Sequence, residues 1–335
     1  MPDNRPLPPP TVQPSSPPHR EALALVFHHL DDSQREGSVQ AILELANTGQ
    51  ANFEGLLLAQ RDRANVGAVW ANQMGGAVAA VWPPNLVDEE PEETADALLA
   101  SLHEHLRETP LVMAQAILES DTDLIADRLR RNGYEHAALL YYLVCPVQVS
   151  PGSGVFFGEN TSRSKPGSPK KTPDPFSPKC PVTFEPFSEE HESRMLEIVD
   201  ATYQNTLDCP RLNGLLEPND VLESYRSTGV YRPELWSFVI DKSSQRDVGC
   251  LLLNDHPDHE QLELVYMGIV PSARGGGFGR HVTQFALTTA QKLGRHRVVL
   301  AVDALNRPAL DAYSTAGFSV SDQRHVFIRV FSGSR

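Results

Sequence analysis

The feature that most constrains the fold of this 335-residue chain is the run RGGGFGR at residues 274–280. It follows the alternating apolar stretch 261–270, which predicts a buried strand, and it opens the helical pattern of residues 279–294. Glycine weakens strands and helices alike, so four glycines in five positions require a physical reason. A strand, a glycine loop and a helix in this order predict an α/β unit in which another group approaches the backbone closely.

The loop has the features of a pyrophosphate-binding site. Without Cβ atoms, successive backbone N–H groups can point into one concavity, and the following helix adds free N–H groups and its positive dipole. Five Arg or Lys and no acidic residue occur between residues 271 and 300, although the whole chain has a net charge of −14. Neither the P-loop nor the dinucleotide fingerprint fits, because no Gly-Lys-Ser/Thr follows and positions 280 and 282 are not glycine.

The pattern that does match is R-x-x-G-x-G, formed by Arg274, Gly277 and Gly279. It resembles the acyl-CoA-binding motif of the GNAT superfamily of N-acetyltransferases. The run 306–318 resembles the superfamily's N-x-x-A-x-x-x-Y-x-x-x-G-F segment. The resemblance covers residues 182–335 and implies that acetyl-CoA is the cosubstrate and that its acetyl group passes directly to a primary amine. The cofactor-binding residues it implies are Met267, Gly268, Ile269, Arg274, Gly275, Gly276, Gly277, Phe278, Gly279, Arg280 and Asn306.

Two catalytic candidates follow from the resemblance and the strand pattern. Family members use the tyrosine that matches Tyr313 to protonate the CoA thiolate; the alternative is that Tyr313 only packs under the sheet. Glu263 is the acidic residue of an otherwise apolar strand, where a half-buried carboxylate would have a raised pKa and suit a general base. A solvated edge glutamate is equally compatible with the pattern. The superfamily's strand also splays at a bulge, for which Gly268 is suitable.

The acceptor side is expected in the loop after the first helix of residues 182–335, where Tyr203, Asp208 and Asn213 are polar. Asp208 could hold a cationic amine, although Asp and Asn are also ordinary turn residues. We expect no metal, because the HPDHE run at 256–260 has poor zinc spacing and reads as a hairpin loop. The four cysteines show no C-x-x-C spacing and are interpreted as reduced thiols.

Composition divides the chain into four parts: a disordered proline-rich tail at 1–19, a domain at 20–147, a flexible linker at 148–181 and the catalytic domain at 182–335. The first domain repeats the order of strands and helices in the second, so we predict an α/β fold of two tandem acetyltransferase-like domains, each a mixed, mostly antiparallel sheet flanked by helices. Residues 83–108 hold eight acidic residues and one Arg, which would repel a pyrophosphate. The first domain is therefore predicted to be a degenerate copy.

The acidic charge argues against nucleic-acid binding, and the lack of a long apolar run argues against a membrane span. No signal-like stretch opens the sequence, so we expect a cytoplasmic protein. The predicted function is an N-acetyltransferase acting on an amine of a small molecule or peptide. The alternative is a non-catalytic module for acyl-CoA binding, sensing or protein interaction. The identity of the acceptor and the oligomeric state stay open.

Overall fold

A computed structural model describes residues 7–73, 75–148, 177 and 179–331. Most of the predicted linker at 148–181 lies outside the described residues. The chain forms two compact units, one of Met1–Ala137 with His325–Arg335 and one of Ala138–Arg324. Each unit is described below by itself.

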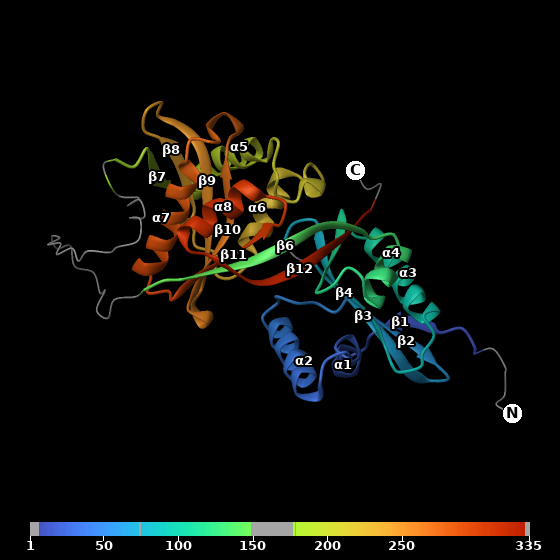
Figure 1. Cartoon of the computed structure of the whole chain (residues 1–335). Helices are drawn as coiled ribbons and strands as arrows, with labels where there is room; N and C mark the ends of the chain where they lie inside the picture. The colour runs from blue at the N-terminus through green and yellow to red at the C-terminus, as the bar shows by residue number, and fades with distance from the viewer. Residues whose placement is uncertain (1–6, 74, 149–176, 178, 332–335) are drawn as a thin grey trace. The chain divides into compact units, whose positions relative to one another are not determined.

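The first unit is a sheet covered by helices on both faces (Figure 1). Its strands follow the order β1-β2-β3-β4-β5, and residues 325–330 of β12 pair antiparallel with β5. Buried residues of α1 and α2 pack on one face and those of α3 and α4 on the other. Its elements are β1 (Thr11–Pro14), α1 (Arg20–Val26), α2 (Asp32–Asn47), β2 (Gly55–Arg61), β3 (Ala64–Gln73), β4 (Val78–Leu86), α3 (Glu93–Arg107), β5 (Met113–Leu118) and α4 (Leu124–Arg131).

The second unit has the same layers. Its strands follow the order β7-β8-β9-β10-β11, and residues 140–146 of β6 pair antiparallel with β11. Helices α7 and α8 pack on one face of this sheet, and α5 and α6 pack on the other. The elements are β6 (Glu135–Pro146), β7 (Val182–Pro186), α5 (Glu192–Tyr203), α6 (Pro218–Arg226), β8 (Ser237–Asp241), β9 (Arg246–His256), β10 (Gln261–Ile269), α7 (Phe278–Lys292), β11 (Arg297–Asp303), α8 (Arg307–Ala316) and β12 (Ser319–Val330). Short 3₁₀ turns are η1 (Glu189–His191), η2 (Pro210–Leu212), η3 (Pro233–Leu235), η4 (Pro257–His259) and η5 (Pro271–Ala273).

The order of elements is the same in the two halves of the sequence, β1–β6 and β7–β12: a strand, two helices, three strands, a helix, a strand, a helix and a strand. The predicted α/β fold class with mixed, mostly antiparallel sheets is confirmed. The last strand of each half, however, pairs with a strand from the other half, since β6 pairs with β11 and β12 pairs with β5. A fragment of residues 182–335 would therefore lack the β6 strand that borders β11.

The N-terminal segment also differs from the prediction. Disorder was expected over residues 1–19, and this is wrong for β1, whose residues Thr11–Pro14 pair antiparallel with Leu57–Gln60 of β2. An edge strand tolerates a proline because one side of its backbone needs no ladder partner. Among the described residues, the helices are all too short or too polar to cross a bilayer.

Candidate functional site

The sheet of the second unit opens between its two parallel strands. Strand β10 pairs with β11 only at Gln261, Leu262 and Glu263. Beyond Glu263, β11 continues beside β6 while β10 continues beside β9. The backbone groups of β10 that face β11 after this point therefore have no ladder partner there among the described residues. The strands form a V whose vertex is Glu263 and whose open end leads toward the glycine loop.

A bulge accompanies this opening, as the resemblance implied. The β9–β10 register shifts between Leu264 and Tyr266, so Val265 is the bulged residue. The bulge reverses the alternation of the strand: Leu264 and Met267 both belong to the core under α7, whereas Tyr266 belongs to the core under α5. Simple alternation along β10 therefore fails after Leu264.

Gly268 has a packing role, and the expectation that it supports the bulge is wrong. It pairs in regular register with Cys250 of β9. A Cβ atom at Gly268 would lie 2.4 Å from Oγ1 of Thr202, so only glycine lets α5 approach the strand this closely.

The glycine loop faces open space. Gly275 and Gly277 have φ angles of 79° and 80°, a left-handed conformation that favours glycine. Gly279 lies in the first turn of α7 without a positive φ, and a Cβ atom there would meet nothing within 4 Å. No contact within the described chain requires glycine at 279, and the open space there would let an external group approach the backbone closely. No side chain caps the α7 N-terminus, whose backbone N–H groups suit an anion.

The two arginines that flank the loop have different surroundings. The Arg274 guanidinium donates hydrogen bonds to the carbonyls of Ile269, Thr202 and Asn205 at 2.8–2.9 Å, and thereby ties the loop to the end of α5. Arg274 was predicted to contact a phosphate. In the structure its guanidinium also holds the loop against the end of α5. Arg280 is exposed, and no hydrogen bond or ion pair joins it to another described side chain. It is the arginine available to an incoming anion.

Tyr313 and Asn306 lie on and before α8. Tyr313 is 5% exposed, and burial raises the pKa of its phenol, so it keeps its proton at neutral pH. Asn306 is the N-cap of α8 and accepts a hydrogen bond from the Ala309 N–H at 3.4 Å. Its predicted cofactor contact therefore competes with a capping role.

Glu263 is paired with a residue that sequence reasoning left outside the site. His256 Nε2 lies 2.7 Å from the Glu263 carboxylate, and the Glu263 side chain is 29% exposed. The signal was present in the sequence, because a hairpin at residues 257–260 makes His256 the diagonal neighbour of Glu263 across β9 and β10. The two side chains form a carboxylate–imidazole dyad at the vertex of the V.

The three predicted acceptor residues all have partners inside the unit. Asp208 accepts a hydrogen bond from the Asp303 N–H at 3.0 Å, and the Asp303 carboxylate accepts one from the Cys209 N–H at 3.1 Å. These two hydrogen bonds hold the loop against the end of β11. Burial raises the pKa of Asp208, and the nearby Asp303 charge adds to this effect. The Tyr203 hydroxyl bonds to that of Tyr225.

The third, Asn213, donates to the Tyr203 carbonyl at 3.4 Å. Sequence reasoning missed Tyr225 and Tyr266, whose rings stack at 5.2 Å. Together with Tyr203, they form an aromatic wall between α5, α6 and β10.

The first unit keeps the V, but one of its own side chains binds a β4 carbonyl beyond the vertex. Strand β4 pairs with β5 only through residues 78–80. Beyond this point, Arg128 of α4 donates to the Pro84 carbonyl at 2.9 Å and pairs with Glu92 at 2.6 Å. Glu92 is the N-cap residue of α3, the counterpart of the glycine loop, and the Arg128 hydrogen bond lowers the pKa of its carboxyl. A carboxylate thus stands where a phosphate would need to bind, which supports the interpretation of a degenerate copy.

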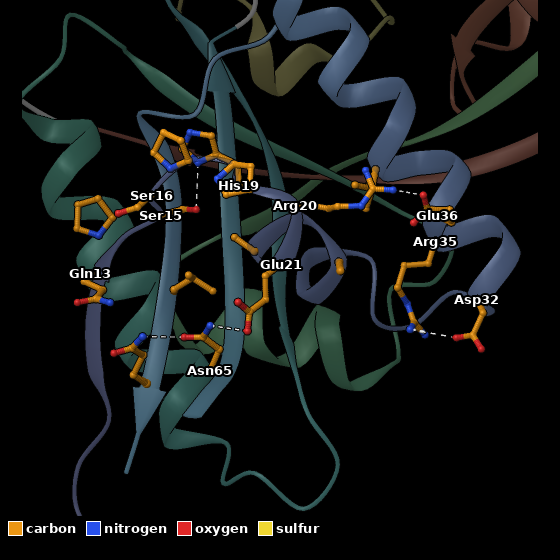
Figure 2. A pocket seen from close by; sticks show the side chains of 18 residues that line it. Gln13, Ser15, Ser16, His19, Arg20, Glu21, Asp32, Arg35, Glu36 and Asn65 are labelled. Carbon is orange, nitrogen blue, oxygen red and sulfur yellow. Dashed lines mark hydrogen bonds and ion pairs between the residues drawn. The ribbon is translucent and has the colours of Figure 1, made fainter. Parts of the chain in front are cut away.

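A separate cavity of about 780 Å³ lies beside β1, α1 and α2 of the first unit (Figure 2). Its charged side chains already pair with one another: Arg20 with Glu36, and Arg35 with Asp32. Glu21 accepts a hydrogen bond from Asn65. These internal pairs leave little uncompensated charge for recognising a ligand, so we assign no ligand to this cavity.

The diverging strands, the bulge and the open glycine loop define an acetyltransferase-like domain. Residues 200–318 match the family model described as Acetyltransferase (GNAT) family. The second unit is therefore similar to this family over residues 200–318.

Curated relatives resemble short segments of the chain, and a solved structure resembles its fold. A mycothiol acetyltransferase of Jonesia denitrificans is 39% identical over 83 residues, which cover 25% of this chain and 26% of that protein. One from Thermomonospora curvata is 42% identical over 64 residues, covering 19% and 21%. The alignments thus span about a quarter or less of these curated relatives. A crystal structure of a GCN5-related N-acetyltransferase from Sphaerobacter thermophilus has a TM-score of 0.61 at 16% identity, covering 97% of this chain and 96% of that one, and shows the same fold.

Proposed function

We propose that the second unit transfers an acetyl group from acetyl-CoA to a primary amine of a small molecule or peptide. The observation that carries the proposal is Gly279, a helical glycine that faces open space at an uncapped helix N-terminus. Glycine within a helix costs roughly 0.5–1 kcal/mol relative to alanine, and here close approach of a pyrophosphate accounts for that cost. The local excess of Arg and Lys supports the same ligand.

The V between β10 and β11 is the proposed path of the pantetheine and the thioester. Backbone groups of β10 after Glu263 are free to hydrogen-bond an extended ligand, as a β-strand partner would. A backbone N–H in this stretch would stabilise negative charge on the thioester oxygen during attack. Acetyl-CoA supplies the acyl group as an activated thioester.

The protein's own groups would move the protons. The amine nitrogen attacks the thioester carbon, the C–N bond forms and the C–S bond breaks. Glu263, held by His256 at 2.7 Å, would accept the proton that the amine loses. Tyr313, neutral because burial raises its pKa, would donate a proton to the departing thiolate. The first unit, with Glu92 in place of a phosphate site, would serve folding or acceptor choice and not the chemical step.

The test is release of free CoA from acetyl-CoA by the full chain, measured over a panel of small amines, polyamines and peptides with free amino termini or lysines. We expect amine-dependent release with at least one acceptor class, and loss of that release in Tyr313→Phe. Tight CoA binding with an intact thioester across the panel would instead support the sensing module. Absence of CoA binding would overturn the proposal.

A further inference from the structure

We propose that Asp121, His136 and His325 form a binding site for a divalent transition metal, of which Zn²⁺ is the best fit. The three residues come from separate segments of the first unit: the loop after β5, the start of β6 and strand β12. In the part of the chain that the structure describes, they are the one group of three or more His, Cys or acidic residues whose donor atoms converge. The site is independent of the proposed acetyl transfer.

The donor atoms already have nearly the spacing of a metal site. His136 Nε2 lies 3.0 Å from His325 Nδ1, and His325 Nδ1 lies 3.8 Å from Asp121 Oδ2. All the donor atoms of the group lie within 4.8 Å of one another. A tetrahedral zinc ion with bonds of about 2.0–2.1 Å separates its ligands by about 3.3 Å. Two of the three separations bracket this value, so small side-chain rotations would complete the site.

A hydrogen bond between the two rings does not account for the whole arrangement. The single nitrogen Nδ1 of His325 faces both His136 and Asp121, and a ring nitrogen carries at most one proton. A cation placed among the three groups would interact favourably with all of them. Two imidazoles and one carboxylate are also a ligand set that Zn²⁺ takes in proteins, with a fourth position left for water.

The surroundings favour a fixed site. The His325 side chain is 13% exposed and the Asp121 side chain is 39% exposed, so the site is closed on the histidine side and open on the aspartate side. The His136 ring lies edge-on to Phe327 at 5.3 Å, which restricts its orientation. Preorganised ligands lower the cost of assembling the site when the metal arrives.

The location gives the metal a consequence for the fold. His325 pairs with Leu118 of β5 and begins the segment of β12 that completes the sheet of the first unit. A bound ion would join this strand to β6 and to the loop after β5. Metal binding should therefore stabilise the first unit by holding its last strand in place.

The experiment is calorimetric titration of the metal-free full chain with Zn²⁺, together with thermal unfolding at saturating Zn²⁺. Saturable binding of one ion per chain and a higher Tm are expected. The variants His136→Gln and His325→Asn retain a hydrogen-bonding group near the replaced ring nitrogen but remove the imidazole ligand. Each should weaken binding by more than the roughly 10–100-fold that follows loss of an outer-shell partner. Asp121→Asn gives a third, partly exposed position at which the fold should be preserved.

The matched control is His259→Asn, which removes an exposed histidine from η4 of the second unit. It should leave Zn²⁺ affinity and the Tm shift unchanged. No saturable binding by the wild-type chain would overturn the proposal. Wild-type affinity in the folded Asp121→Asn and His136→Gln variants would overturn it too, because the ion would then bind elsewhere.

Discussion

Replacing Gly279 with alanine is expected to stabilise the protein while weakening its binding of CoA. The new Cβ atom would meet nothing within 4 Å, and the position is helical, so the change removes the entropic cost of glycine without a clash. That cost is roughly 0.5–1 kcal/mol, which for a unit of this size raises Tm by about 1–4 °C. The added methyl group would at the same time obstruct close approach of a phosphate to the first turn of α7.

The loss of affinity follows from the contact that is displaced. A hydrogen bond to a charged group contributes about 1.5–3 kcal/mol, so losing one should weaken CoA binding roughly 10- to 150-fold. Titration calorimetry with CoA and thermal unfolding of the same samples measure both effects. Gly277 is a poorer test position, because its φ of 80° would strain any replacement even without a ligand.

Gly268→Ala is the matched control for the stability effect. Its Cβ atom would lie 2.4 Å from Thr202 Oγ1, so this variant should lose about 1–3 kcal/mol of stability through overpacking. If Gly279→Ala binds CoA like the wild type, the glycine loop does not approach a phosphate and the proposed CoA site is wrong.

Three further outcomes are expected. Tyr313→Phe should lower kcat by about 10²–10⁴-fold with little change in CoA affinity, and a loss of only a few-fold would mean that the tyrosine merely packs. Glu263→Gln should also lower kcat, and His256→Asn should do so more weakly; an unchanged kcat in Glu263→Gln would locate the base elsewhere. Burial lowers the pKa of His103 to about 3 from 6.5, so the unfolded chain binds this proton first as the pH falls. Urea unfolding should show that the free energy of unfolding decreases by up to about 1.4 kcal/mol for each pH unit below pH 6.5. The decrease should be less steep in His103→Gln.

Local sequence signals predicted most elements of the second unit. The apolar alternation of β10, the glycine loop and the proline-initiated helix α8 all arise from interactions between residues near in sequence. Helices α1 and α2 were not predicted, because α2 buries only Val39 fully and thus has a weak apolar face. Strand β1 was not predicted, because the prolines around it are typical of a disordered segment.

Non-local features could not be predicted from one sequence. Nothing in the pattern of β12 tells whether it pairs with β11 or with β5, since either partner accepts an apolar strand. The bulge falls at Val265, which has no local signature, whereas the glycine that the sequence offers for a bulge, Gly268, is required by its proximity to Thr202. The convergence of His136 and His325 likewise depends on strands that are 189 positions apart in the chain.

We expect the two units to differ in CoA binding: the second binds acyl-CoA at its glycine loop, and the first has lost this capacity. The most direct test is the stoichiometry of CoA binding to the full chain, measured by titration calorimetry. One CoA per chain is expected, because Gly279 faces open space at the start of α7 whereas the N-cap of α3 is Glu92, a carboxylate paired with Arg128. Two equivalent CoA sites per chain, or none, would contradict this account.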